Sequence, residues 1–167
     1  FNRLIEQDTI GFWIHLSSHL DKDEETDMKL GVCADPKQAP SLMDAGFDFI
    51  ELHVQNHLKT EAGEDAFVGA VQRIITSPLP ALAANCFVPG HLKITGPEVD
   101  LDALRAYVKV AFERAERAGI PTIVFGSGGA RRIPDDFDRD EAWAQLVTFG
   151  QLIGPLAEDL AVIRILG

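Results

Sequence analysis

Residues 121–142 read PTIVFGSGGARRIPDDFDRDEA, and this stretch decides the class of fold. The apolar run at 122–125 is typical of a buried β-strand, and it stops at a cluster of glycines. Asp138 and Glu141 then have the spacing of a helix-capping box. Apolar residues continue beyond them at helical spacing as far as Asp159. The stretch therefore predicts a strand, a loop and a helix in succession, which is one βα unit.

Similar units recur along the rest of the chain. Short apolar runs bounded by turn residues predict strands, and apolar residues three or four apart predict helices between them. We expect strands near residues 29–35, 47–54, 81–88, 121–126 and 160–166, and helices near residues 36–46, 62–76, 101–118 and 138–159. Because strands that alternate with helices form βαβ units, the chain is predicted to be an α/β protein with a parallel sheet.

Two arrangements of these units remain open. In the first, the chain is the N-terminal half, about four to five βα units, of a (β/α)8 TIM barrel, which needs about 250 residues in full. In the second, five strands form a complete doubly wound open sheet. The glycine cluster follows the fourth predicted strand instead of the first, so it does not match a dinucleotide-binding fingerprint.

The two ends of the sequence differ from its regular middle. Residues 1–27 show no clear period and are interpreted as an extension or linker, or as sequence translated from upstream of a true start at Met28. Residues 28–167 are interpreted as one partial barrel domain. Because the sequence starts with Phe1 and stops inside the fifth predicted strand, we expect it to be a fragment.

The composition argues against several classes of partner. The chain has 167 residues and a formal net charge of −11, whereas binding to a nucleic-acid backbone requires a basic face. No apolar run approaches the roughly 20 residues that cross a membrane, and no secretory signal is recognisable. The 2 cysteines are too few for a disulfide scaffold. We therefore expect a cytoplasmic protein with no nucleic-acid or membrane partner.

Polar residues gather where the predicted strands end, which in a parallel α/β fold is where active sites lie. Glu51 interrupts an apolar run, and it either binds substrate hydroxyls or a metal, or pairs with a neighbouring Arg or Lys. Asn85 either binds a substrate hydroxyl or satisfies a backbone group. His91 follows the third predicted strand, and it either reaches an anionic substrate or faces solvent.

Two histidines follow Glu51 closely. His53 ends the second predicted strand, so we expect its side chain at the same rim. His57 is four residues further on, which is the spacing of two metal ligands on a helix. Because a strand would leave His57 in the following loop, we predict no metal pair at these positions.

The glycine cluster and its arginines complete the candidate residues. Glycines leave backbone N–H groups open to an anion, and guanidinium groups match phosphate or carboxylate. The alternative is a flexible turn whose arginines pair with the aspartates at 135, 136 and 138. We interpret the loop as a substrate contact made by these residues: Gly126, Ser127, Gly128, Gly129, Arg131 and Arg132.

The chain resembles a known family over about residues 28–159. The resemblance rests on four runs: MKLGVCAD (28–35), AGFDFIELHV (45–54), ANCFVPGHLKITGP (84–97) and IVFGSGGARRIPDDFDRDEA (123–142). These runs are similar to the sugar phosphate isomerases and epimerases that have a xylose-isomerase-like TIM barrel. The run VFGSGGAR with the following P-D-x-F is the most specific part of the match.

The resemblance implies an isomerase of carbohydrate metabolism that moves a proton between the carbons next to the carbonyl of a sugar or sugar phosphate. It also implies a divalent metal ion (manganese, magnesium, cobalt or zinc), bound by carboxylates and a histidine on later strands, with two glutamates that move the proton. Such a metal polarises the carbonyl and lowers the cost of an enediolate-like transition state.

The sequence departs from the family in its fifth predicted strand. The family implies a glutamate there, whereas this chain has LAVIRILG, with Arg164 or Ile165 about where a metal ligand is expected. No catalytic or metal-binding residue is therefore carried over, and the chain by itself is predicted to be inactive. Only the rim is carried over, as substrate contacts: Glu51, His53, Asn85, His91 and the loop 126–132.

Two other functions stay open. The missing acid in the fifth strand favours a non-catalytic α/β module that binds a small ligand or a protein. A metal-dependent barrel endonuclease that repairs abasic DNA is the remaining alternative, and the net charge of −11 argues against it. A half barrel would leave strand edges and apolar faces open, so we predict a chain that is marginally stable or forms a homo-oligomer.

Overall fold

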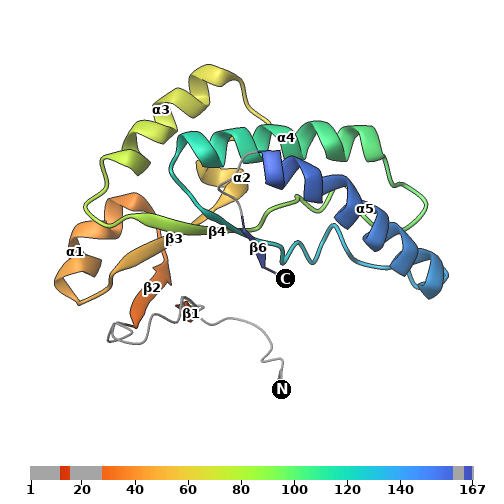
Figure 1. Ribbon diagram of the computed structural model, residues 1–167, viewed down its shortest axis with the longest axis horizontal. Helices are drawn as coiled ribbons and strands as arrows, with labels where there is room; N and C mark the ends of the chain where they lie inside the picture. Colours follow the sequence, from red (N-terminus) through yellow and green to blue (C-terminus); the bar gives the residue numbers. More distant parts are fainter. Residues whose placement is uncertain (1–11, 16–27, 160–163, 167) are drawn as a thin grey trace.

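The computed structural model describes residues 12–15, 28–159 and 164–166, with side chains within 28–158. Within these residues, six strands form one sheet in the order of the sequence (Figure 1). They are β1 (Phe12–His15), β2 (Lys29–Cys33), β3 (Phe49–His53), β4 (Ala81–Asn85), β5 (Thr122–Val124) and β6 (Arg164–Leu166). The helical segments are η1 (Pro36–Gln38), α1 (Ala39–Asp44), α2 (Val54–His57), α3 (Glu64–Ile75), α4 (Leu101–Arg117) and α5 (Arg139–Asp159).

The order of the strands decides between the two arrangements that the sequence left open. From β3 to β6 every strand is parallel to the one before it and lies beside it. A doubly wound sheet reverses its strand order at a switch point, and no reversal occurs here. The open-sheet alternative is therefore wrong, and the chain is an α/β protein with the strand succession of half a (β/α)8 barrel.

The helices α3, α4 and α5 lie on one side of the sheet, and α4 packs against α5 (Figure 1). Their inward residues meet the outward residues of the strands in one apolar core. Ile50 from β3, Phe112 from α4 and Phe149 from α5 each have no exposed surface. The apolar core lies between the helices and the sheet, whereas polar side chains lie at the carboxyl ends of the strands. We call this end of the sheet the rim.

Two of the predicted strands end earlier than expected. The third was predicted to run to residue 88, but β4 stops at Asn85 because Cys86 has a φ of 51°, outside the β region. The second was predicted to include Val54, which instead begins the short helix α2. His57 therefore lies on a helix, and the prediction that it lies in a loop is wrong.

One strand was not predicted. β1 pairs antiparallel with β2 at the edge of the sheet, with Phe12 opposite Val32, inside the segment interpreted as an extension or linker. The rest of residues 1–27 lies outside the described residues, so the division into residues 1–27 and 28–167 stays a prediction. In the described part of the chain, no helix has the length and apolar character needed to cross a membrane.

Candidate functional site

Three side chains from neighbouring strands meet at the carboxyl end of the sheet. Cys33 ends β2, Glu51 lies opposite it on β3, and Asn85 ends β4. The Cys33 Sγ donates to Glu51 Oε2 at 3.2 Å, and the Asn85 amide nitrogen donates to Cys33 Sγ at 3.3 Å. We call Cys33, Glu51 and Asn85 the rim cluster.

Glu51 is the most unusual member of the rim cluster. It is only 2% exposed, and its Oε1 atom has no hydrogen-bond partner in the described part of the chain. No Arg or Lys side chain among the described residues forms an ion pair with it, so the pairing with a basic neighbour is not made by any of them. A buried carboxyl without a cation is costly as a carboxylate, which favours the protonated form.

The electrostatics of the rim cluster agree with its burial. Burial raises the pKa of the Glu51 carboxyl, while hydrogen bonding to Cys33 and Asn85 acts in the opposite direction. Burial, helped by the neighbouring Glu51, raises the pKa of the Cys33 thiol to about 12. Both groups are therefore held toward their neutral forms. The cluster suits hydrogen bonding to an uncharged polar group, and Cys33 is not poised as a thiolate nucleophile.

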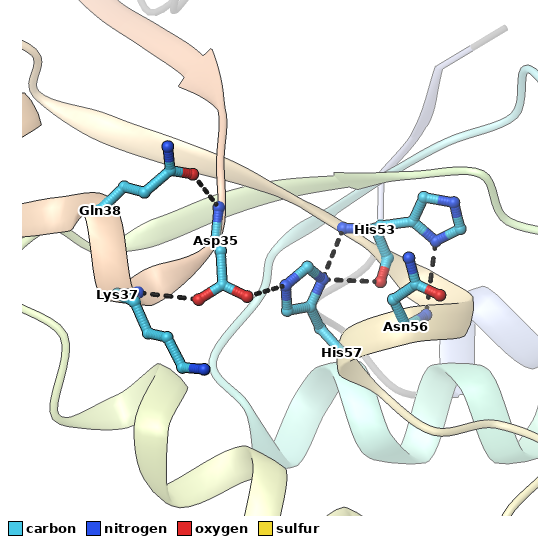
Figure 2. A network of polar contacts seen from close by, with 6 residues as sticks. All are labelled: Asp35, Lys37, Gln38, His53, Asn56 and His57. Atoms are coloured by element: carbon cyan, nitrogen blue, oxygen red, sulfur yellow. Dashed lines mark hydrogen bonds and ion pairs between the residues drawn. The ribbon is translucent and has the colours of Figure 1, made fainter.

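His53 lies at the same rim, but its side chain hydrogen-bonds to backbone within the protein (Figure 2). Its Nδ1 accepts from the Asn56 backbone N–H at 3.4 Å and so caps α2. The His53 backbone N–H donates to His57 Nδ1 at 3.1 Å, and His57 Nε2 lies 3.4 Å from Asp35 Oδ2. Burial lowers the pKa of His53. These contacts join the loop after β2 to the helix after β3.

The glycine-rich loop after β5 is ordered by contacts within the protein. Ser127 is 8% exposed, and its hydroxyl accepts from the Val88 backbone N–H at 2.9 Å. A Cβ atom on Gly129 would lie 3.1 Å from the Cα of Gly90, so this glycine permits close packing of the loops after β4 and β5. Gly126 and Gly128 are exposed.

The two arginines of this loop do not pair with the aspartates that follow them. Arg131 Nε donates to the Gly126 carbonyl at 2.9 Å, and its guanidinium lies 5.0 Å above the Phe125 ring. Arg132 is exposed, and neither arginine forms an ion pair within the described residues. The alternative in which they pair with the following aspartates is therefore wrong. The guanidinium of Arg131 is already engaged by its own loop, which weakens its case as an anion ligand.

His91 lies away from the rim cluster, at the outer surface of the loop after β4. Its side chain is 62% exposed, and its Nε2 lies 2.8 Å from Glu61 Oε1. Lys93 from the same loop donates to the Gly129 carbonyl at 3.2 Å. The structure thus joins Glu51 and Asn85 through Cys33, places His53 on the same strand as Glu51, and pairs His91 with Glu61.

A cavity of about 290 Å³ lies between the glycine-rich loop and α5. It is lined mainly by apolar side chains, including Trp143 and Leu146, together with Gly128 and Arg131. Thr95, which also lines it, is 3% exposed and its hydroxyl oxygen has no partner within the described residues. Arg139 also lines the cavity, so it contains two guanidinium groups, of which that of Arg131 is bonded to the Gly126 carbonyl.

Sequence reasoning missed Cys33 as a member of the site. A thiol in an apolar run reads as an ordinary buried cysteine, and only its position at the end of a strand signals the rim. Within the described residues, no group of three or more His, Cys, Asp and Glu side chains could hold a metal ion. The resemblance places its metal ligands on later strands, so the metal stays a prediction.

Comparisons with known proteins give a structural similarity for this chain but no family. No family model matches it, and no curated protein matches it. Among solved structures it is similar to mannonate dehydratase from Streptococcus suis serotype2, at 13% sequence identity and a TM-score of 0.49. The match covers 87% of this chain and 49% of that protein, so the chain spans about half the length of this structural relative.

Proposed function

We propose that this chain is part of a sugar or sugar phosphate isomerase or epimerase, and that the rim cluster contacts oxygen atoms of the substrate. The observation that carries the proposal is Glu51, a carboxyl that is 2% exposed at the carboxyl end of a parallel sheet and has no cationic partner among the described residues. The resemblance over residues 28–159 supports the choice of a sugar as the ligand.

The chemistry of Glu51 suits a reaction in which negative charge develops on a substrate oxygen. When a proton leaves the carbon next to a sugar carbonyl, the electron pair moves to the carbonyl oxygen and forms an enediolate. A carboxyl held neutral by burial can donate a hydrogen bond to that oxygen. We assign Glu51 this role as hydrogen-bond donor, and Asn85 the role of binding a neighbouring hydroxyl.

The base that removes the proton is not assigned to any described residue. A divalent metal remains part of the proposal for the family reaction, but the described residues lack a ligand group for it. No step proposed for this chain depends on the metal. The role of the rim cluster is to bind and orient the substrate.

The proposal is tested by saturation-transfer NMR of the 167-residue chain with a panel of pentoses, hexoses and their phosphates. We expect one sugar class to bind, and Glu51→Leu to weaken its binding, while Glu116→Leu, at an exposed position of α4, leaves it unchanged. Absence of sugar binding, or equal losses in both variants, would contradict the proposal.

A second assay separates catalysis from binding. The same mixtures in D₂O, with manganese or magnesium added, are followed for deuterium incorporation at the carbon next to the carbonyl. Incorporation by this chain or by a longer form of the polypeptide supports an isomerase. Sugar binding without exchange in either form would favour the non-catalytic binding module.

A further inference from the structure

We propose that the cavity between η1, α2 and α3 binds a phosphate group, at a site separate from the rim cluster. The cavity has a volume of about 240 Å³. Three basic side chains line it: Lys37 from η1, Lys59 from the loop after α2, and Arg73 from the last turn of α3. We call these three residues the basic triad.

The ammonium and guanidinium groups of the basic triad form no ion pair within the described residues, and the triad differs from the other unpaired cations because its three members line one cavity. Lys109 pairs with Glu113, and both Arg114 and Arg117 pair with Glu64. Within the described part of the chain, no ion pair is formed by the side chain of any triad member, and the hydrogen bonds that other side chains form with them involve only the backbone of Lys37 and Lys59. In a chain with a net charge of −11, three unpaired cations around one cavity form a local reversal of charge.

The carboxylate in the cavity lining, Asp35, is engaged by its own surroundings. Its Oδ1 accepts from the Lys37 backbone N–H at 2.9 Å, and its Oδ2 lies 3.4 Å from His57 Nε2. The Lys37 ammonium forms no ion pair with this carboxylate (Figure 2). The hydrogen bond from the Lys37 backbone N–H is the main cause that lowers the Asp35 pKa, and the charge of the Lys37 ammonium adds a small part. Asp35 thus holds η1 and α2 together and leaves the triad free to meet an outside anion.

The backbone conformation of Lys59 supports a role for its side chain in the proposed site. Lys59 has a φ of 53°, a left-handed conformation that costs energy in a residue with a side chain. The Arg114 guanidinium fixes this conformation by donating to the carbonyls of Leu58, Lys59 and Ala62. A buried arginine therefore holds the Lys59 segment against α3, on which Arg73 lies.

The chemistry of the lining suits a phosphate group. Two ammonium groups supply point charge, and the Arg73 guanidinium offers a fork of donors that matches phosphate oxygens. The exposed Asn56 amide at the same cavity adds further polar contacts. The ligand is either free phosphate or a phosphomonoester, which share this chemistry.

Isothermal titration calorimetry at low ionic strength tests the proposal with inorganic phosphate, glycerol 3-phosphate and glycerol as probes. We expect phosphate-containing probes to bind and glycerol not to bind. Lys37→Gln/Arg73→Gln should weaken phosphate binding at least about tenfold, because it removes two charge-assisted contacts. The matched control is Lys29→Gln/Arg105→Gln, which removes the same charges at exposed positions outside the cavity.

Each outcome decides the matter. Tighter binding of glycerol 3-phosphate identifies an ester as the ligand, and equal or tighter binding of inorganic phosphate identifies the free ion. No binding of either probe, or equal weakening in both double variants, overturns the site and leaves only general screening of charge. Unphosphorylated sugars and Glu51→Leu report on the rim cluster alone, so failure of one proposal does not affect the other.

Discussion

The burial of Glu51 predicts an unusual dependence of stability on pH. A glutamate whose pKa is raised by folding binds its proton more tightly in the folded state than in the unfolded chain. Its contribution to stability is therefore complete below the unfolded pKa of about 4.3, and it is lost as the pH rises through the folded pKa. Glu51→Gln keeps the shape of the neutral acid but cannot ionise.

The magnitude follows from proton linkage. Between the two pKa values the free energy of unfolding of wild type, minus that of Glu51→Gln, falls by at most about 1.4 kcal/mol per pH unit, since one proton is involved. For a chain of 167 residues, that loss corresponds to about 3–6 °C in Tm for each pH unit. Other titrating groups, such as Asp35, are common to both proteins, so the difference isolates Glu51.

The assay is urea unfolding followed by circular dichroism, repeated at intervals from pH 4 to pH 8. Glu116→Gln makes the same chemical change at an exposed position of α4 and serves as the control. The difference in the free energy of unfolding between wild type and Glu51→Gln must fall more with pH than the difference between wild type and this control. A difference that stays constant, or that rises with pH, would refute the claim that Glu51 is buried in a neutral form.

Three further substitutions test how the loops at the rim are held. Arg114→Met removes the donor to the carbonyls of Leu58 and Ala62 and should lower the free energy of unfolding by about 3–5 kcal/mol in urea titrations. A loss under about 1 kcal/mol would show that these hydrogen bonds contribute little to stability. Ser127→Ala leaves the buried Val88 N–H without its acceptor and should cost about 1–3 kcal/mol in the same assay; an unchanged midpoint contradicts this. Gly129→Ala brings a Cβ within 3.1 Å of backbone and should increase hydrogen exchange in the loops after β4 and β5, and unaltered exchange would show that the loops have room.

The regular elements could be predicted because their signals are local. Apolar spacing places α4 and α5, and Asp100 begins α4 as an N-cap by accepting from the backbone N–H groups of Asp102 and Ala103. The early end of β4 could not be predicted, because the left-handed conformation of Cys86 has no signature in the residue type. β1 was missed because strand pairing at an edge depends on a partner elsewhere in the chain.

The candidate site was predictable only in part. Glu51 and Asn85 stand out because a polar residue in an apolar strand needs a reason. Cys33 does not stand out, because a cysteine in an apolar run is ordinary, and its contact with Glu51 depends on the register of β2 against β3. His53 was placed at the right rim, but its capping of α2 required knowing that a helix follows it directly.

The position of an anion site depends on which cations the fold leaves unpaired. Arg131 lies beside three glycines, yet its guanidinium is bound to the Gly126 carbonyl and stacked on Phe125. Lys37 and Arg73 have no glycine motif near them and no acidic partner within the described residues. A phosphate binds best to cations that are hydrogen-bonded only to water. A guanidinium that is bonded to a carbonyl must first break that bond, which leaves the carbonyl oxygen without its donor and costs free energy. The cavity beside η1 therefore has the stronger physical claim, although the glycine-rich loop has the stronger sequence signal.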